Sequence, residues 1–113
     1  MIDCASSGVW GNYGCDGGFI ELAFEYTGVY PLMQDRDYPY EVLQQDKCLY
    51  DSTLARVQTE EEQVVTPKNI PQLKAALVKG PVGVSVDADK SFFRNYKSGI
   101  IKSANCGSDI GHA

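Results

Sequence analysis

The chain is short of positive charge, of long apolar runs and of histidine, and each shortage excludes a class of protein. Ten Lys and Arg residues stand against fifteen Asp and Glu residues, which gives a net charge of −5. Nucleic acids and anionic membranes both need a cationic footprint, so we expect neither as a partner. The apolar runs are far too short for a transmembrane helix. Its 43% hydrophobic and 22% charged residues are typical of a folded soluble domain or part of one.

Closely spaced metal ligands are also lacking. A zinc site usually pairs ligands about two to four residues apart, whereas Cys4, Cys15, Cys48 and Cys106 lie far from one another and His112 is the single histidine. We therefore expect no metal site and no cofactor. An even number of cysteines instead favours disulfides in an oxidising compartment. Four cysteines allow three pairings, and spacing alone does not choose among them.

Glycines gather in one stretch near the start of the chain. Residues 5–18 contain five of them, which predicts a loop with unusual backbone angles. A helix is predicted to follow over residues 19–28, where four apolar side chains recur at helical spacing. These are Phe19, Leu22, Ala23 and Tyr26.

A second helix is marked at both of its ends. Asn69 is a suitable N-cap, Pro71 is tolerated in the first turn, and Gly80 followed by Pro81 stops the helix. Alternating valines then predict a half-buried strand over residues 82–86. We also predict one short helical turn over residues 92–96 and a second strand over residues 99–101. Helices in the first half and strands in the second indicate an α+β arrangement.

Seven short motifs occur along the chain in a fixed order. They are Ile2-Asp3-Cys4, Gly11-Asn12-Tyr13-Gly14-Cys15-Asp16-Gly17-Gly18, Tyr38-Pro39-Tyr40, Gly80-Pro81-Val82, Tyr96-Lys97-Ser98-Gly99-Ile100, Cys106-Gly107 and His112-Ala113. Each is weak alone, but the ordered set resembles the papain family of cysteine peptidases, closest to its cathepsin L-like branch, over essentially the whole chain. The resemblance implies an incomplete papain-like, two-lobed α+β fold over residues 1–113. About 1–60 would belong to the helical lobe and about 61–113 to the β-rich lobe.

The resemblance also implies that the chain is an internal piece of a longer enzyme. In this family the catalytic Cys lies near the mature N-terminus, about 130–150 residues before the catalytic His. With His112 as that histidine, the nucleophile would lie about 20–40 residues before Met1, so none of the four cysteines present can serve. The Asn that orients the histidine is expected after it and is absent too. We therefore expect the chain to be inactive alone.

The resemblance assigns His112 a catalytic role, in which it forms an ion pair with the thiolate and later protonates the leaving amine. Imidazole suits this task because its reference pKa, about 6.5, permits proton transfer in both directions near neutrality. The alternative is a surface histidine with no task. Gly17 and Gly18 match the backbone edge that pairs with an extended substrate, by the logic of strand addition. An ordinary tight turn is the alternative for them.

The remaining assignments by resemblance concern substrate side chains and disulfides. The pocket for the second substrate residue before the scissile bond, with its rim, is assigned to Phe19, Ile20, Ser85, Ile110 and Ala113. Phe19 and Ile20 could instead be core residues, because apolar side chains at a helix start usually pack inward. The resemblance pairs Cys4 with Cys48, and it pairs Cys15 and Cys106 with cysteines outside the chain.

Residues 18–48 carry no histidine pair and no extra cysteine, so the occluding insertion of cathepsin B-like members is absent. The expected activity is therefore that of an endopeptidase. Its partners would be peptide or protein substrates and an inhibitory propeptide, and its location a lysosome, a vacuole or the cell exterior. A catalytically dead homologue that binds peptides or serves a structural role is the main alternative. A small free-standing disulfide-bonded binding module is a third reading.

Overall fold

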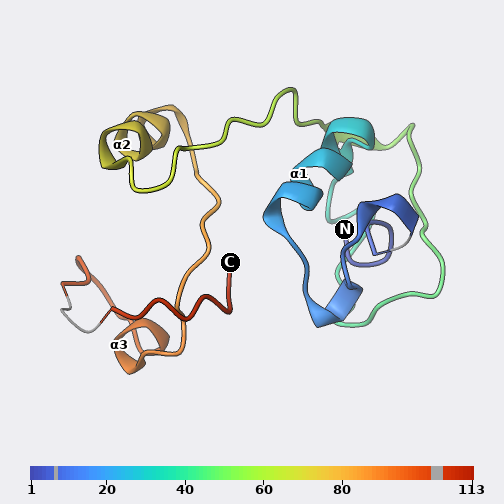
Figure 1. Ribbon diagram of the computed structural model, residues 1–113. Coiled ribbons are helices and arrows are strands. Elements are labelled where there is room, and N and C mark those ends of the chain that lie inside the picture. Colours follow the sequence, from blue (N-terminus) through green and yellow to red (C-terminus); the bar gives the residue numbers. More distant parts are fainter. Residues whose placement is uncertain (7, 103–105) are drawn as a thin grey trace. The chain divides into compact units, whose positions relative to one another are not determined.

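The computed structural model describes residues 1–6, 8–102 and 106–113, so Ser7 of the predicted glycine-rich loop lies outside the described residues. The chain divides into two units, Met1–Thr66 and Pro67–Ala113, which we call unit 1 and unit 2 (Figure 1). Unit 1 contains the 3-10 turns η1 (Gly8–Trp10) and η2 (Gly14–Asp16), helix α1 (Ile20–Val29) and strands β1 (Leu32–Met33) and β2 (Ala55–Val57). Unit 2 contains helices α2 (Ile70–Lys79) and α3 (Ser91–Arg94).

The glycine-rich loop has the unusual backbone angles that its composition predicts. Four of its glycines have φ values between 61° and 107°, in the region that side-chain-bearing residues rarely adopt. These are Gly8, Gly11, Gly14 and Gly17. At Gly14 space is limiting as well, because a Cβ atom there would overlap the Gln44 side chain. The Gln44 amide oxygen accepts the Cys15 N–H at 3.3 Å, which ties the loop to a distant part of the chain.

Helix α1 confirms the predicted first helix and carries the core of unit 1. Tyr26 is only 4% exposed and packs with Cys4 and Ala5. The Trp10 ring stands edge-on to the Tyr26 ring at a centroid distance of 5.4 Å. Phe19 does not share this buried face as predicted, because it precedes the helix in an extended conformation and is exposed. The buried cluster therefore forms where the helix meets the start of the chain.

The sheet of unit 1 is small. Strands β1 and β2 are antiparallel, pairing Leu32 with Val57 and Met33 with Ala55 across an irregular register. Strands of two and three residues are too short to show the alternation by which a sequence predicts a strand.

Unit 2 confirms both predicted helical segments. The Asn69 side chain accepts the Gln72 N–H at 3.0 Å, which caps α2 as expected, and Pro71 lies in the first turn. The Gly80 N–H bonds to the Ala76 carbonyl where the helix ends. Helix α3 is the short turn predicted over residues 92–96, and Tyr96 closes it by donating its N–H to Phe93.

The two strands predicted in unit 2 are wrong. Of residues 82–86, only Val86 pairs, in an isolated antiparallel bridge with His112. Residues 99–101 have no strand conformation. A strand requires a partner for its backbone N–H and C=O groups. Within the described part of unit 2, His112 alone provides such a partner, so the alternating valines remain an extended segment.

Burial separates the two units. All four buried residues found in the described ranges, Cys4, Ala5, Tyr26 and Thr27, belong to unit 1. In unit 2 the apolar face of α2 is exposed at Ile70 and Leu77. No helix in the described part of the chain combines the length and apolar character that crossing a membrane requires.

Candidate functional site

The predicted site residues fall into two groups. Unit 1 contains Gly17, Gly18, Phe19 and Ile20, and unit 2 contains Ser85, Ile110, His112 and Ala113. The structure defines each group within its own unit.

The unit 1 group lies where the glycine-rich loop enters α1. Gly17 has a φ of 107° and an exposed backbone, and a Cβ atom on Gly18 would overlap the Asn12 side chain. The same Asn12 oxygen accepts the Phe19 N–H at 2.8 Å. The Gly17 carbonyl accepts the Tyr13 N–H at 2.9 Å, which closes the loop. Glycine at both positions therefore keeps the backbone open while Asn12 and Tyr13 hold its shape.

Phe19 and Ile20 differ in their surroundings. Phe19 is 55% exposed, and its ring contacts the Tyr13 ring edge-on at a centroid distance of 6.3 Å. Ile20 is the first residue of α1 and is half-buried. Phe19 thus belongs to the surface of unit 1, where an apolar ligand can reach it, and is not a core residue of that unit.

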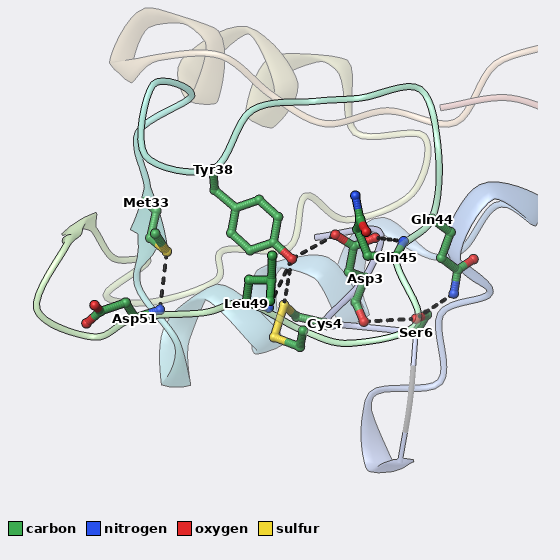
Figure 2. The surroundings of a disulfide bond; sticks show 10 residues. Asp3, Cys4, Ser6, Met33, Tyr38, Gln44, Gln45, Leu49 and Asp51 are labelled. Atoms are coloured by element: carbon green, nitrogen blue, oxygen red, sulfur yellow. Dashed lines mark hydrogen bonds between the residues drawn. A yellow bond between two sulfur atoms is a disulfide. The ribbon is translucent and has the colours of Figure 1, made fainter.

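A disulfide joins Cys4 to Cys48 in unit 1, with an S–S distance of 2.03 Å. Figure 2 shows the Tyr38 hydroxyl pointing toward Asp3 and the disulfide. This hydroxyl donates to Asp3 Oδ2 at 2.7 Å and accepts the Leu49 N–H at 3.2 Å. The second Asp3 oxygen accepts the Gln45 N–H at 2.7 Å. Three segments that are distant in sequence are therefore held around one disulfide.

Tyr38 and Asp3 were not among the predicted site residues, although both lie in motifs that carry the family resemblance. Burial, together with the negative charge of Asp3, raises the pKa of the Tyr38 hydroxyl above its ordinary value, whereas the Leu49 N–H acts in the opposite direction. The hydroxyl accordingly stays neutral and keeps donating to Asp3. The repeated tyrosines of Tyr38-Pro39-Tyr40 were the available signal, but sequence does not show which of the two is satisfied inside the fold.

The other two cysteines, Cys15 and Cys106, are free and exposed in the structure. No group of three or more His, Cys, Asp or Glu residues in the described ranges is arranged to hold a metal ion.

The unit 2 group centres on the bridge between Val86 and His112. The Val86 N–H donates to the His112 carbonyl at 2.7 Å, and His112 Nδ1 lies 2.8 Å from the Ala113 carbonyl oxygen. Ser85 precedes Val86, so the bridge brings Ser85 next to the segment that carries the histidine. Ile110, His112 and Ala113 are exposed. The histidine is thus fixed through its backbone while its ring is accessible from solution.

A further residue of this region was missed by the sequence analysis. The Asp87 side chain is 5% exposed and accepts the Asp109 N–H at 3.3 Å. No motif signalled it, because an aspartate after an alternating run is an ordinary strand end. Only the tertiary contact with the histidine segment distinguishes it.

Comparison with known proteins supports one family over the whole chain. Residues 1–113 match the family described as papain family cysteine protease. The chain is 33% identical to mouse (Mus musculus) cathepsin K over 116 aligned residues, which cover 100% of the chain and 34% of that protein. It is also 33% identical to rat (Rattus norvegicus) cathepsin S over an alignment that covers 99% of the chain and 34% of that protein. The chain thus spans about a third of the length of these relatives.

A solved structure has the same fold. Digestive procathepsin L 3 of the Tenebrio molitor larval midgut matches with a TM-score of 0.84 and 34% identity, covering 98% of this chain and 36% of that one. This match confirms the predicted papain-like α+β fold, of which the chain forms a part. The chain belongs to the papain family of cysteine proteases, in its cathepsin L-like branch.

Proposed function

We propose that this chain is the part of a cysteine endopeptidase that supplies the catalytic histidine and much of the peptide-binding surface. The observation that carries the proposal is the Val86–His112 bridge, which holds an accessible imidazole within a chain that matches the papain family over all of its residues. The nucleophilic Cys and the Asn that orients the histidine would come from the rest of the protein.

His112 would act as the base of the reaction. It takes the proton of the nucleophilic thiol, and the resulting thiolate attacks the carbonyl carbon of the scissile bond. The imidazolium then protonates the leaving amine, and the acyl-enzyme is hydrolysed by water. The exposure of His112 in the structure supports this role, because its side chain can be reached from solution.

Gly17 and Gly18 would bind the substrate backbone. The Gly18 N–H donates no hydrogen bond within the described residues, and neither glycine carries a side chain that would obstruct an incoming extended peptide. Exposed Phe19 beside them offers an apolar surface to a substrate side chain.

The family resemblance assigns Phe19, Ile20, Ser85 and Ile110 to the specificity pocket, and Ala113 to substrate binding. Three of these side chains are large and apolar, and the small Ser85 leaves depth. None is acidic, so a buried substrate arginine would stay unpaired, at a large desolvation cost. We therefore expect a preference for a bulky apolar or aromatic residue two positions before the cut.

The disulfide supports a proposal for the cellular setting. Cys4–Cys48 persists in an oxidising environment, which fits a lysosome, a vacuole or the cell exterior. Free and exposed Cys15 and Cys106 would pair with cysteines elsewhere in the protein. The matched digestive enzyme is a procathepsin, which supports an inhibitory propeptide here as well.

The decisive test uses the full-length protein and a fluorogenic peptide. We expect hydrolysis that a thiol-alkylating inhibitor abolishes, and His112→Ala to lower kcat/KM by about 10²–10⁴-fold or more, as expected for loss of a positioned acid–base group. Ser108→Ala, an exposed change in the same segment, is the control and retains activity. Peptide binding without hydrolysis by the wild type would instead favour the catalytically dead homologue.

The pocket is tested with two reporter peptides that differ only in carrying Phe or Arg two residues before the cut. The wild type is expected to prefer Phe, and Ser85→Phe to reduce that preference by filling the pocket. Ser98→Phe, which is exposed in the same unit, leaves the ratio unchanged. Equal cleavage of both peptides, or an unchanged ratio in Ser85→Phe, would refute the pocket assignment while leaving His112 in place.

The 113-residue chain by itself is expected to hydrolyse no peptide, because we assign the nucleophile to another part of the protein. Incubating the purified chain with the Phe reporter tests this. Hydrolysis that is sensitive to thiol alkylation would contradict the assignment of the nucleophile to another part of the protein.

A further inference from the structure

The side chain of Asp87 is far less exposed to solvent than is usual for a carboxylate. This side chain is 5% exposed, whereas all the buried residues found in the described ranges belong to unit 1. Charged side chains are rarely covered to this degree unless they are paired and hydrogen-bonded, because removing a charge from water is costly. Something must therefore compensate this carboxylate.

Its two oxygens have separate partners. Asp87 Oδ1 accepts the Asp89 N–H at 3.3 Å, which closes a local turn. Asp87 Oδ2 lies 3.4 Å from Lys90 Nζ and accepts the Asp109 N–H at 3.3 Å. One oxygen thus shapes the segment of Asp87 itself, and the other binds the segment that leads to His112.

Gly107 makes room for this contact. A Cβ atom on Gly107 would overlap Asp87 Oδ2 and come within 2.6 Å of Lys90 Cε. The φ of Gly107 is not in the left-handed region, so the backbone itself does not require glycine here. The required feature is space, because a side chain at position 107 would displace the carboxylate from Asp109.

The contact with Asp109 is the second of two attachments. Val86, the neighbour of Asp87, donates its N–H to the His112 carbonyl at 2.7 Å. Consecutive residues of one segment therefore hold the backbone at Asp109 and at His112. A single attachment leaves a segment free to pivot, whereas two set its direction as well as its position.

We propose that Asp87 is a positioning residue for the catalytic histidine: with Gly107 leaving space, its carboxylate holds the Asp109 backbone and sets the direction of the segment that carries His112. The consequence for catalysis rests on the proposed function. The holding contact itself is independent of that function.

The substitution Asp87→Asn separates this role from simple loss of bulk. The amide keeps the size of the carboxylate but has only one acceptor oxygen. The Asp89 and Asp109 N–H groups each bind a separate oxygen of Asp87, so the NH₂ group of the asparagine must face one of these donors. Lys90→Met removes the charge partner of Asp87 and keeps both hydrogen bonds. The charged groups near the carboxylate are Lys90, Asp89 and Asp109, and the Asp89 side chain is engaged by Arg94.

The kinetic test uses the full-length enzyme. We expect Asp87→Asn to lower kcat about tenfold, with KM within about twofold of the wild type, because a buried donor left facing a donor costs enough for that change. The matched control is Asp89→Asn, whose side chain is exposed and forms no hydrogen bond or ion pair with residues 106–113; its kcat is expected to stay within about twofold.

Gly107→Ala gives an independent test in which residue 87 remains an aspartate. Gly107→Ala is expected to lower kcat as Asp87→Asn does. The double variant is expected to lose little more than either single variant, because both substitutions break the same contact between Asp87 and Asp109. Gly111→Ala is the control, since a Cβ atom there meets nothing within 4 Å. Additive losses in the double variant would overturn the proposal.

Amide hydrogen exchange separates a failure of this proposal from a failure of the proposed function. In Asp87→Asn and Gly107→Ala the Asp109 amide is expected to exchange faster, with the Val86 amide much less affected, whether or not the protein hydrolyses peptides. An unchanged Asp109 exchange rate would refute the contact. Faster exchange with an unchanged kcat in an active enzyme would refute the positioning role. An inactive wild type with the expected exchange pattern would refute only the proposed function.

Discussion

Helices α1 and α2 are both ten residues long, yet they are stabilised in different ways. Helix α2 has an N-cap side chain, a proline in its first turn and a glycine stop, but no buried residue. Helix α1 has no side-chain cap hydrogen bond, and it buries Tyr26 and Thr27 against the rest of unit 1. Local signals define one helix and tertiary packing the other.

The same contrast extends to the units. Unit 1 combines a disulfide, an aromatic cluster and every buried residue found in the described ranges. The described part of unit 2 is held by one backbone bridge and by polar contacts around Asp87 and Asp89. Most helical stability in proteins comes from packing of an apolar face rather than from propensity. The described part of unit 2 therefore has little of the side-chain burial that stabilises unit 1.

The largest expected effect concerns the disulfide of unit 1. Replacing both Cys4 and Cys48 by Ala is expected to lower the free energy of unfolding of unit 1 by about 4 kcal/mol, because the bridge closes a long loop. Cys15→Ser is the control for loss of a thiol. Local opening free energies from amide hydrogen exchange in the full-length protein measure the difference. An equal loss in unit 2 would mean that the two units unfold together.

The next effect compares one buried and one exposed apolar side chain. Tyr26→Ala is expected to destabilise the full-length protein by about 3 kcal/mol, since it removes the buried centre of unit 1. Leu77→Ala is expected to cost less than about 1 kcal/mol if the α2 face, where Leu77 is 54% exposed, stays uncovered. Chemical denaturation of both variants measures this. A large loss in Leu77→Ala would reveal that another part of the protein covers α2.

A smaller effect is expected at the helix cap. Asn69→Ala removes the acceptor of the Gln72 N–H and is expected to cost about 1 kcal/mol, with the loss confined to α2. Asn69→Asp retains an acceptor oxygen and is expected to restore most of the stability. Exchange of the amides in the first turn of α2 is the measurement. No change at these amides would show that packing, rather than the cap, maintains α2 in the full-length protein.

A last effect, similar in size to that of the helix cap, concerns pH and the Tyr38 hydroxyl. Its pKa is raised in the folded state, so the stability linked to its neutral form is complete below its ordinary value near 10 and is lost as pH rises through the folded value. We expect Tyr38→Phe to reduce the stability of unit 1 by about 1 kcal/mol at neutral pH and to flatten its decline above about pH 10. Tyr40→Phe, at an exposed position, is the control. Urea unfolding of both variants and of the wild type, at neutral and at alkaline pH, measures these differences in stability.

The parts of the fold that were predictable are those with local causes. The glycine-rich loop, the cap at Asn69 and the short turn α3 depend on neighbours within a few residues, and the structure confirms all three. The strand predicted over residues 82–86 failed because alternation indicates which side chains can be buried together, but not whether a partner strand exists.

The candidate site shows the same division. The roles assigned to His112, Gly17 and Gly18 rest on motifs that occur in a fixed order along the chain, and they stay predictions. Asp87 was not predicted, because its role depends on a contact with Asp109 and on the space that Gly107 leaves for its carboxylate. Tyr38 and Asp3 lie in recognisable motifs, but only the fold shows that they bond to each other.

The sequence by itself determined the family, the helices with capped or periodic signatures, and the residue types available for chemistry. The family follows from the order of the motifs along the chain, whereas the helix signals arise from covalent geometry and from interactions within a few residues. Only the tertiary structure decided which helix acquired a core, which valine found a partner and which carboxylate holds the histidine segment. Those outcomes depend on groups far apart in the chain, whose encounter depends on burial and hydrogen bonding across the whole fold.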